Sequence, residues 1–336
     1  MIHLVTLDFP PEFDGGIASW AEDLARALVD AGEDVCVHAR HTGLSQAYDQ
    51  TLPFPVLRMR GRSWGRWKAA WVMAQAFPLM QQGHRAIFAT WDLATLAAPL
   101  LARRGVRFGV AFHGSDLSRL QGTPRGLLRV FEGAAALWPV SDFLNGLLER
   151  HGRPGQVLPM PLALAQPGAP GEGLVVVARL NRLKGVDRAI SLARALGWPL
   201  TVVGDGPDRA RLEALAVDVP VAFTGRLPRH RALEAYAGKA ANLLLPREDK
   251  EGRGAEGLGL SLLEGATRGV PAVGCRTGGV PQAADLVLED PDDAVGSAEQ
   301  LRGWLSSGPR GLEAHARVAG AHGARLAVER VLGDLA

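Results

Sequence analysis

The sequence predicts an α/β protein made of two doubly wound domains, and three observations support this prediction. The chain has 336 residues, which is too long for one ordinary hydrophobic core. Short apolar runs alternate with amphipathic stretches, the pattern of parallel strands joined by crossover helices. One segment rich in Pro, Gly and Ala, 157–173, interrupts this alternation, and it predicts a linker between the domains.

The first half of the chain carries the alternation from its second residue onward. The strands that we expect here are the apolar runs at 2–7, 34–39, 85–90, 107–113 and 135–141. A helical pattern of apolar residues begins near Ile17, and further helical patterns run through Leu100 and Leu148. These elements predict an N-terminal Rossmann-like domain over residues 1–163.

The alternation starts again after the linker. The strands that we expect are 174–180, 199–206, 221–227, 241–246 and 270–275, with helices at 186–196 and 208–216. They predict a C-terminal Rossmann-like domain over 164–315, and we expect 316–336 to form a helix that packs back on the N-terminal domain. Because ligands of doubly wound sheets bind at the carboxyl ends of the strands, we expect the two domains to face a central cleft.

Composition excludes several classes of protein. Lys and Arg number 37 against 35 Asp and Glu, and a net charge of +2 does not suggest nucleic-acid binding. Cys36 and Cys275 form neither a CxxC pair nor a disulfide framework, which fits a reducing cytoplasm and two small buried side chains. The N-terminus does not have the pattern of a signal peptide, and no apolar run reaches the roughly 18 residues of a membrane span. We therefore expect a cytoplasmic protein.

Two loops in the first half carry candidate binding residues. Gly15 and Gly16 stand at the start of the first helix, where their amides can face an anion. The alternative is a flexible turn. His113 and Asp116 follow an expected strand, so His113 can hydrogen-bond a sugar or act with a carboxylate, or it can be purely structural.

Arg179 and Lys184 follow the first expected strand of the second half. Two cations at the end of a strand can converge on a diphosphate, one as a planar fork and the other as a point charge; the alternative is two solvated surface cations. The sequence Gly-Asp-Gly-Pro at 204–207 lacks the third glycine of a dinucleotide fingerprint. It predicts a tight turn close to a ligand or a helix, not a nicotinamide site.

Two glutamates eight positions apart, Glu256 and Glu264, bracket the start of an expected helix. Gly257 and Gly259 disfavour a helix before Gly259 or Leu260, so Glu256 falls in a loop and Glu264 in the first two turns. The amides of 257–261 are then the unpaired donors of a helix start, and the carboxylates can accept hydrogen bonds from sugar or ribose hydroxyls. The alternative, acids favoured by the helix dipole, explains Glu264 better than Glu256.

These motifs resemble those of the family-4 retaining glycosyltransferases, which have the GT-B fold. The segment from Glu256 to Glu264 resembles the E-x7-E motif of that family, and Gly-Val-Pro-Ala-Val and Thr-Gly-Gly-Val follow it. The other similar motifs lie at 10–16, 113–116, 139–142, 178–185, 204–207 and 224–227. In order and spacing the resemblance extends over residues 1–285.

The resemblance implies a role for each matching residue. Arg179 and Lys184 would hold the donor diphosphate and stabilise the leaving nucleotide. Glu264 would bind the ribose hydroxyls and Glu256 the hydroxyls of the transferred sugar. The remaining expected contacts are amides facing phosphate at Gly16, Gly257, Leu258, Gly259 and Leu260, His113 on the donor sugar, and Arg226 near the base.

The implied reaction is transfer of a hexose, with retention, from a UDP- or GDP-sugar to a glycan, glycolipid or polysaccharide acceptor. Fixed cations and a helix start can stabilise the leaving diphosphate, so we expect neither a metal nor a cofactor. Two departures are Gln282, where the family often has an acid, and a longer loop before Glu256 in which Glu251 competes as the first acid. The alternatives are a GT-B epimerase of nucleotide sugars and a non-catalytic transferase-like subunit.

Residues 58–73 bear on the acceptor. They combine Arg and Lys with Trp64, Trp67 and Trp71 at helical spacing, which suits an anionic membrane surface or a lipid-linked acceptor. We therefore expect peripheral contact with the inner face of a membrane through 58–73. The alternatives are a tryptophan stripe buried in its own domain and a soluble acceptor.

Overall fold

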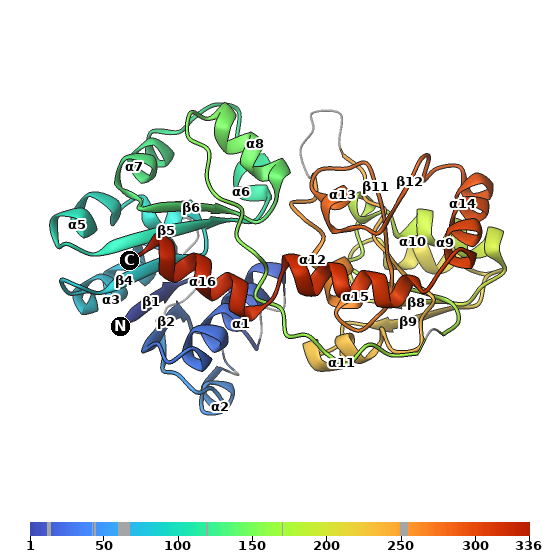
Figure 1. The fold of residues 1–336 in the computed structure, drawn as a ribbon, viewed down its shortest axis with the longest axis horizontal. Coiled ribbons are helices and arrows are strands. Elements are labelled where there is room, and N and C mark those ends of the chain that lie inside the picture. The colour runs from blue at the N-terminus through green and yellow to red at the C-terminus, as the bar shows by residue number, and fades with distance from the viewer. Residues whose placement is uncertain are drawn as a thin grey trace. The chain divides into compact units, whose positions relative to one another are not determined.

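The computed structural model describes residues 1–11, 15–41, 43, 45–59, 68–118, 120–169, 171–248 and 255–336. This part of the chain forms two compact units, one of Met1–Leu162 with His322–Ala336 and one of Ala163–Ala321 (Figure 1). Each unit contains a six-stranded sheet in which every pair of neighbouring strands is parallel. The predicted α/β class with two Rossmann-like sheets is therefore confirmed.

The sheet of the N-terminal unit has the strand order β3-β2-β1-β4-β5-β6, so the order reverses between β1 and β4. Its strands are β1 (Ile2–Val5), β2 (Val35–Arg40), β3 (Val56–Met59), β4 (Arg85–Phe88), β5 (Arg107–Phe112) and β6 (Ala136–Pro139). The sequence did not predict β3. This edge strand is only half-buried along its whole length, so it has no continuous apolar run that would reveal it.

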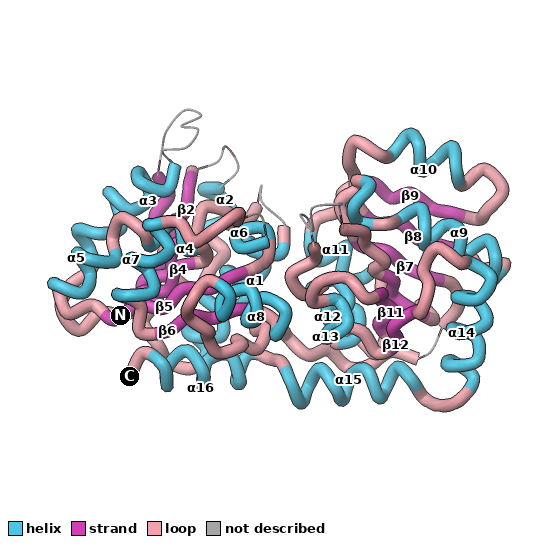
Figure 2. Tube along the Cα trace, turned by 90° about the horizontal axis from the view of Figure 1, so that it is seen from above, coloured by secondary structure: helices cyan, strands magenta, loops and turns pink. Residues whose placement is uncertain are grey.

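Helices cover both faces of this sheet (Figure 2). They are α1 (Gly16–Asp30), α2 (Ser45–Asp49), α3 (Lys68–Ala76), α4 (Trp91–Ala94), α5 (Ala98–Arg103), α6 (Ser115–Ser118), α7 (Arg125–Gly133), α8 (Asp142–Arg150), α16 (Ala324–Asp334) and the 3-10 turn η2 (Phe77–Leu79). Helix α16 packs on α1, and the indole N–H of Trp138 donates to Asp334 Oδ2 at 2.8 Å. The end of the chain is thus part of the N-terminal unit.

The sheet of the C-terminal unit has the order β12-β11-β10-β7-β8-β9. Its strands are β7 (Leu174–Val177), β8 (Leu200–Val203), β9 (Val221–Gly225), β10 (Ala241–Leu243), β11 (Ala272–Cys275) and β12 (Leu286–Leu288). The helices are η3 (Arg182–Lys184), α9 (Val186–Leu196), α10 (Arg209–Leu215), α11 (Arg229–Glu234), α12 (Leu260–Ala266), α13 (Val280–Ala283), α14 (Ala294–Ser306) and α15 (Arg310–Ala321). A core of Val, Leu and Ala side chains lies between the strands and α9 and α14. The sheet therefore brings the ends of β7 and β10 next to each other.

The segments around Met160 and His322, where the chain leaves and re-enters the N-terminal unit, are hydrogen-bonded to each other. In the segment expected as a linker, Leu158, Met160 and Leu162 are buried. The Met160 N–H donates to His322 Nδ1 at 3.1 Å, and the Gly323 N–H donates to Met160 O at 2.8 Å. The C-terminal segment that was expected as one helix over 316–336 is divided, since α15 belongs to the C-terminal unit and α16 to the N-terminal one.

The segment 58–73 lies partly outside the described residues, which omit 60–67. Arg58 is not part of an exposed basic face, because its side chain is buried in an ion pair with Asp49 (2.7 Å). Trp71, on α3, is 45% exposed. Among the described residues, no helix combines the length and apolar character needed to cross a bilayer.

Candidate active site

The start of helix α12 separates the two glutamates, as the sequence predicted. Gly259 precedes the helix with φ +95° and ψ 57°, a left-handed conformation that favours glycine. Glu256 lies in the loop before it and Glu264 in the second turn. Gly259 therefore marks the change of backbone conformation between the two acids, so Glu256 lies in a loop and Glu264 in a helix.

Lys184 forms an ion pair with Glu256, and the Lys184 and Glu256 side chains are 30% and 20% exposed, respectively. Lys184 ends η3, where its backbone N–H donates to Asn181 Oδ1 at 3.1 Å. Gly185 has φ +63°, and a Cβ there would lie 1.8 Å from Leu245 O. Only glycine lets the loop after β7 cross the end of β10 so closely, so this crossing fixes the position of Lys184.

Arg179 lies in the same loop with an exposed side chain, and within the described ranges it forms no ion pair. Two glycines of the Gly-Asp-Gly-Pro sequence support this loop from β8. Cβ atoms on Gly204 and Gly206 would lie 1.9 Å from Ala178 O and 2.2 Å from Leu180 O. These glycines therefore allow close approach to the backbone that carries Arg179, and neither approach involves a helix.

Glu264 is 13% exposed and lies 3.3 Å from the Arg229 guanidinium. Below it, the Tyr236 hydroxyl and the Asn242 amide both donate to Ser261 O, at 3.0 and 2.6 Å. Burial, with a smaller effect of Glu264, raises the pKa of Tyr236 well above its usual range. Arg229, Tyr236 and Asn242 were not predicted from the sequence, because a polar residue in or near a strand or helix gives no sign of its partner in the fold.

The Thr-Gly-Gly sequence at 277–279 holds the backbone of Glu256. The Gly279 N–H donates to Glu256 O at 2.8 Å. Gly278 has φ +53°, and a Cβ on it would lie 2.3 Å from the same oxygen. The first acid is therefore fixed through its main chain by a loop more than twenty residues further along the chain.

Arg226 is exposed just after β9, the edge strand of this sheet. Strands β8 and β7 separate β9 from β10. The expected position of Arg226 near a base thus remains a prediction.

In the N-terminal unit, α1 begins at Gly16 with Gly15 as its N-cap, and Gly15 has an extended φ of −74°. A Cβ on Gly15 would meet no atom within 4 Å. The backbone conformation therefore does not require glycine at this position, and the helix start itself is what can face an anion.

His113 follows β5 and packs its ring edge-on against Trp20, with 4.7 Å between ring centroids. Its Nε2 is buried with no hydrogen-bond partner among the described residues. Burial lowers the pKa of His113 to about 3, so the imidazole is neutral at pH 7. A neutral ring with an unused nitrogen can exchange one hydrogen bond with a hydroxyl but cannot supply positive charge.

Asp116 serves the backbone and not the imidazole. Its carboxylate accepts from the backbone N–H groups of Gly114 (2.7 Å) and His113 (3.2 Å). Burial raises the pKa of Asp116 to about 6, although these N–H groups act in the opposite direction. Asp116 therefore shapes the turn after β5 through these backbone N–H groups, and the action of His113 on a sugar or with a carboxylate stays a prediction.

Among the described residues, His, Cys, Asp and Glu side chains form no metal-binding group around Glu256 or Glu264. Each acid lies against a cation, Lys184 or Arg229. Within the described ranges, the group suited to a metal ion is His3, Cys36 and His38, on β1 and β2.

Comparison with known families matches both units. The family "Glycosyl transferase 4-like domain" matches residues 15–163, and "Glycosyl transferases group 1" matches residues 170–316. A GDP-mannose-dependent alpha-(1-6)-phosphatidylinositol monomannoside mannosyltransferase of Mycolicibacterium smegmatis is 30% identical over 320 residues, which are 83% of this chain and 81% of that protein. The sulfoquinovosyl transferase SQD2 of Arabidopsis thaliana is 33% identical over 134 residues, which are 38% of this chain but only 24% of that protein.

A solved structure supports the fold over the whole chain. The Anabaena protein Alr3699/HepE, in complex with UDP-glucose, is similar with a TM-score of 0.77 over 99% of this chain and 98% of that one, at 14% identity. Such a low identity shows the fold and not the substrate. From the two family matches, the Mycolicibacterium relative and this fold, the chain belongs to the group 1 glycosyl transferases and has their GT-B fold.

Proposed function

We propose that this glycosyltransferase is a retaining enzyme of family 4. It moves a hexose from a UDP- or GDP-sugar to a glycan, glycolipid or polysaccharide acceptor without a metal. The observation that carries the proposal is the arrangement at α12, where Glu256 and Glu264 lie on either side of a helix start and pair with Lys184 and Arg229. Carboxylates that can accept hydrogen bonds from hydroxyls, amides that can donate to phosphate, and cations thus lie at one end of one sheet.

The charge that develops in the reaction explains the cations. Breaking the bond between the sugar and the diphosphate places negative charge on the leaving group, and preorganised cations and amides lower the energy of that state. Lys184 and the exposed Arg179 are the cations for this role, and Gly257, Leu258, Gly259 and Leu260 supply the amides. These fixed charges supply the charge stabilisation that a bound divalent metal can also supply.

The two carboxylates bind different sugars of the donor, the ribose and the transferred hexose. Glu264 stays on the helix and accepts from the ribose hydroxyls, while Glu256 accepts from the transferred hexose once the diphosphate takes up Lys184. His113 adds one hydrogen bond from a neutral ring, and the helix start at Gly15 and Gly16 faces phosphate. Arg226 contributes near the base. The acceptor then attacks from the face that the nucleotide leaves, which retains the configuration of the sugar.

The relatives guide the choice of acceptor. The name of the Mycolicibacterium relative gives GDP-mannose as donor and a phosphatidylinositol mannoside as acceptor. A lipid-linked acceptor also suits the exposed Trp71 at the end of the basic segment 58–73. We therefore propose a cytoplasmic enzyme with peripheral contact to the inner membrane face, acting in glycolipid or polysaccharide assembly.

The test begins with the donor. UDP-, GDP- and ADP-sugars are screened for an upward shift in melting temperature, since a ligand that binds the folded state stabilises it. Hydrolysis or transfer of the donor that binds is then measured with EDTA present, and NMR of the product gives the anomeric configuration. Retention without added metal supports the proposal, and an inverted product or a strict requirement for Mg²⁺ or Mn²⁺ contradicts it. Release of an epimerised nucleotide sugar would identify an epimerase, and binding without turnover a non-catalytic subunit.

A further inference from the structure

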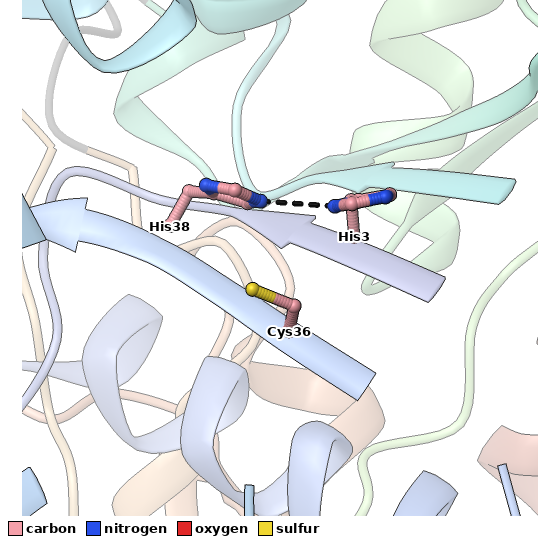
Figure 3. A group of neighbouring side chains, drawn as sticks. All are labelled: His3, Cys36 and His38. Atoms are coloured by element: carbon pink, nitrogen blue, oxygen red, sulfur yellow. Dashed lines mark hydrogen bonds between the residues drawn. The ribbon is translucent and has the colours of Figure 1, made fainter. Parts of the chain in front are cut away.

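A cluster of metal-binding side chains lies in the core of the N-terminal unit, on residues that the transfer reaction does not use. His3 is on β1, and Cys36 and His38 are on β2 (Figure 3). His3 and Cys36 are partners in the parallel pair, and Cys36 and His38 are two residues apart, so all three lie on one face of the sheet. We propose that His3, Cys36 and His38 bind a zinc ion that ties β1 to β2.

The geometry is close to that of a zinc site. One nitrogen or sulfur atom from each residue lies within 4.8 Å of the others, and His3 Nδ1 is 3.0 Å from His38 Nε2. With Zn–N near 2.0–2.1 Å and Zn–S near 2.3 Å, the ligand atoms of a tetrahedral site are about 3.3–3.7 Å apart. The imidazoles need to separate by a few tenths of an ångström and the thiol to approach by up to about 1.3 Å, which is within reach of side-chain rotations. Three protein ligands leave the fourth position to water.

A further histidine orients the first one. His3 Nε2 lies 2.9 Å from His84 Nδ1, in the half-buried turn before β4. Metal-bound histidines commonly donate the N–H of their other nitrogen to such a partner, which fixes the tautomer and the ring orientation. On His38 the other nitrogen, Nδ1, is buried without a hydrogen-bond partner in the described part of the chain, so Nε2 is the nitrogen placed to bind.

The protonation states suit a metal that binds through neutral imidazoles. His3 and His38 are fully buried, and burial lowers the pKa of each to about 4, so both rings are neutral at pH 7. Burial, with a smaller effect of Asp34, raises the pKa of the Cys36 thiol to about 11, so the thiol keeps its proton without a metal. Zinc binding therefore forms one Zn–S bond and two Zn–N bonds and releases the thiol proton to solvent. The Asp34 carboxylate, near enough to act on both His3 and Cys36, offsets part of the remaining positive charge.

The test uses the chain with its metal removed by dialysis against a chelator that is then itself removed. One equivalent of Co²⁺ is added as a spectroscopic probe, and binding through Cys36 gives a thiolate-to-cobalt absorption band in the near ultraviolet, which zinc then abolishes. The matched control is Cys275→Ser, since Cys275 is the other cysteine of the chain and is also buried. Wild type and Cys275→Ser are expected to show the band and to gain melting temperature with zinc, whereas Cys36→Ser is expected to do neither.

The structure also predicts a graded effect. His84→Ala keeps all three ligands and is expected to retain the band while the affinity for Co²⁺ falls about 10–100-fold. Absence of the band in wild type, or the same band in Cys36→Ser, would overturn the proposal and leave His38, His3 and His84 as a metal-free chain of hydrogen-bonded imidazoles. If Cys36→Ser does not fold, the Cys275→Ser spectrum still decides, because Cys36 is then the remaining thiol in the chain. None of these measurements depends on transfer activity.

Discussion

Gly278→Ala is a test of whether the main chain that carries Glu256 must stay in place for transfer. A Cβ at this position would lie 2.3 Å from Glu256 O, where ordinary van der Waals contact begins at 3.4 Å. The Glu256 backbone, or the loop that carries Gly278, therefore moves by about 1 Å, and the hydrogen bond from Gly279 to Glu256 O (2.8 Å) is strained.

Two separate costs follow from this geometry. The left-handed conformation of Gly278, φ +53°, costs a non-glycine residue roughly 1–2 kcal/mol of folding free energy. A displacement of about 1 Å in a group that positions substrate can lower the rate by about 10²-fold. We expect kcat/KM to fall by about that factor while the chain remains folded.

Gly197→Ala separates the two costs. Gly197 ends α9 with φ +67°, and a Cβ there would meet no atom within 4 Å. This control variant carries the same conformational cost without displacing Glu256. Unfolding free energies from urea titration and kcat/KM for the donor are measured for both variants and wild type. Near-normal kcat/KM in a folded Gly278→Ala would refute the reasoning, as would an equal loss of kcat/KM in Gly197→Ala.

Three further changes test other parts of the structure. Glu256→Gln is expected to lower kcat/KM about 10–150-fold, which is the value of one hydrogen bond to a charged group. The unfolding free energy from a urea titration should fall by less than about 1 kcal/mol, because the ion pair with Lys184 is partly exposed. Unchanged kinetics would remove Glu256 from the site. Tyr236→Phe deletes one of the two side-chain donors to Ser261 O and should cost about 0.5–1.5 kcal/mol of unfolding free energy by the same titration. No loss would show that the donor is dispensable. His3 and His38 have pKa values lowered to about 4, so the unfolded chain binds more protons than the folded chain below about pH 6.5. In zinc-free protein the unfolding free energy should therefore decline as pH falls from about 6.5 to about 4, and it should decline less steeply in His3→Gln. The same slope of unfolding free energy against pH in wild type and His3→Gln would contradict this.

The fold was predictable because parallel strands buried on both faces are continuous apolar runs. This signal identified β1, β2 and β7 and the interruption between the two units. It failed at two of the four edge strands, β3 and β12, although it identified the edge strands β6 and β9. The half-buried β3 has an Arg in its short sequence, and the three apolar residues of β12 are flanked by Asp285 and Glu289, so neither lies in a longer apolar run.

The site was predictable in part for a similar reason. Local signals, such as glycines before a helix or cations after a strand, identified Glu256, Lys184 and the start of α12. The partners of these residues come from distant parts of the chain, and no local pattern records them. The contacts of Arg229 with Glu264, of Tyr236 with Ser261 O and of Gly278 with Glu256 depend on the order of strands β9, β10 and β11 in the sheet.

The pairing of Lys184 with Glu256 gives the proposed donor site a simple logic. Two groups that would bind neighbouring parts of a donor, the diphosphate and the transferred sugar, are held against each other before any donor is bound. Their mutual attraction lowers the cost of keeping both partly out of water. A diphosphate that binds Lys184 also frees Glu256 to accept a hydrogen bond from a hydroxyl, so binding of the diphosphate and binding of the sugar are coupled. In the Lys184→Met variant Glu256 has no such partner, so donor affinity should fall while the preference for one hexose over another weakens as well. A simple phosphate contact would lower affinity for all donors equally.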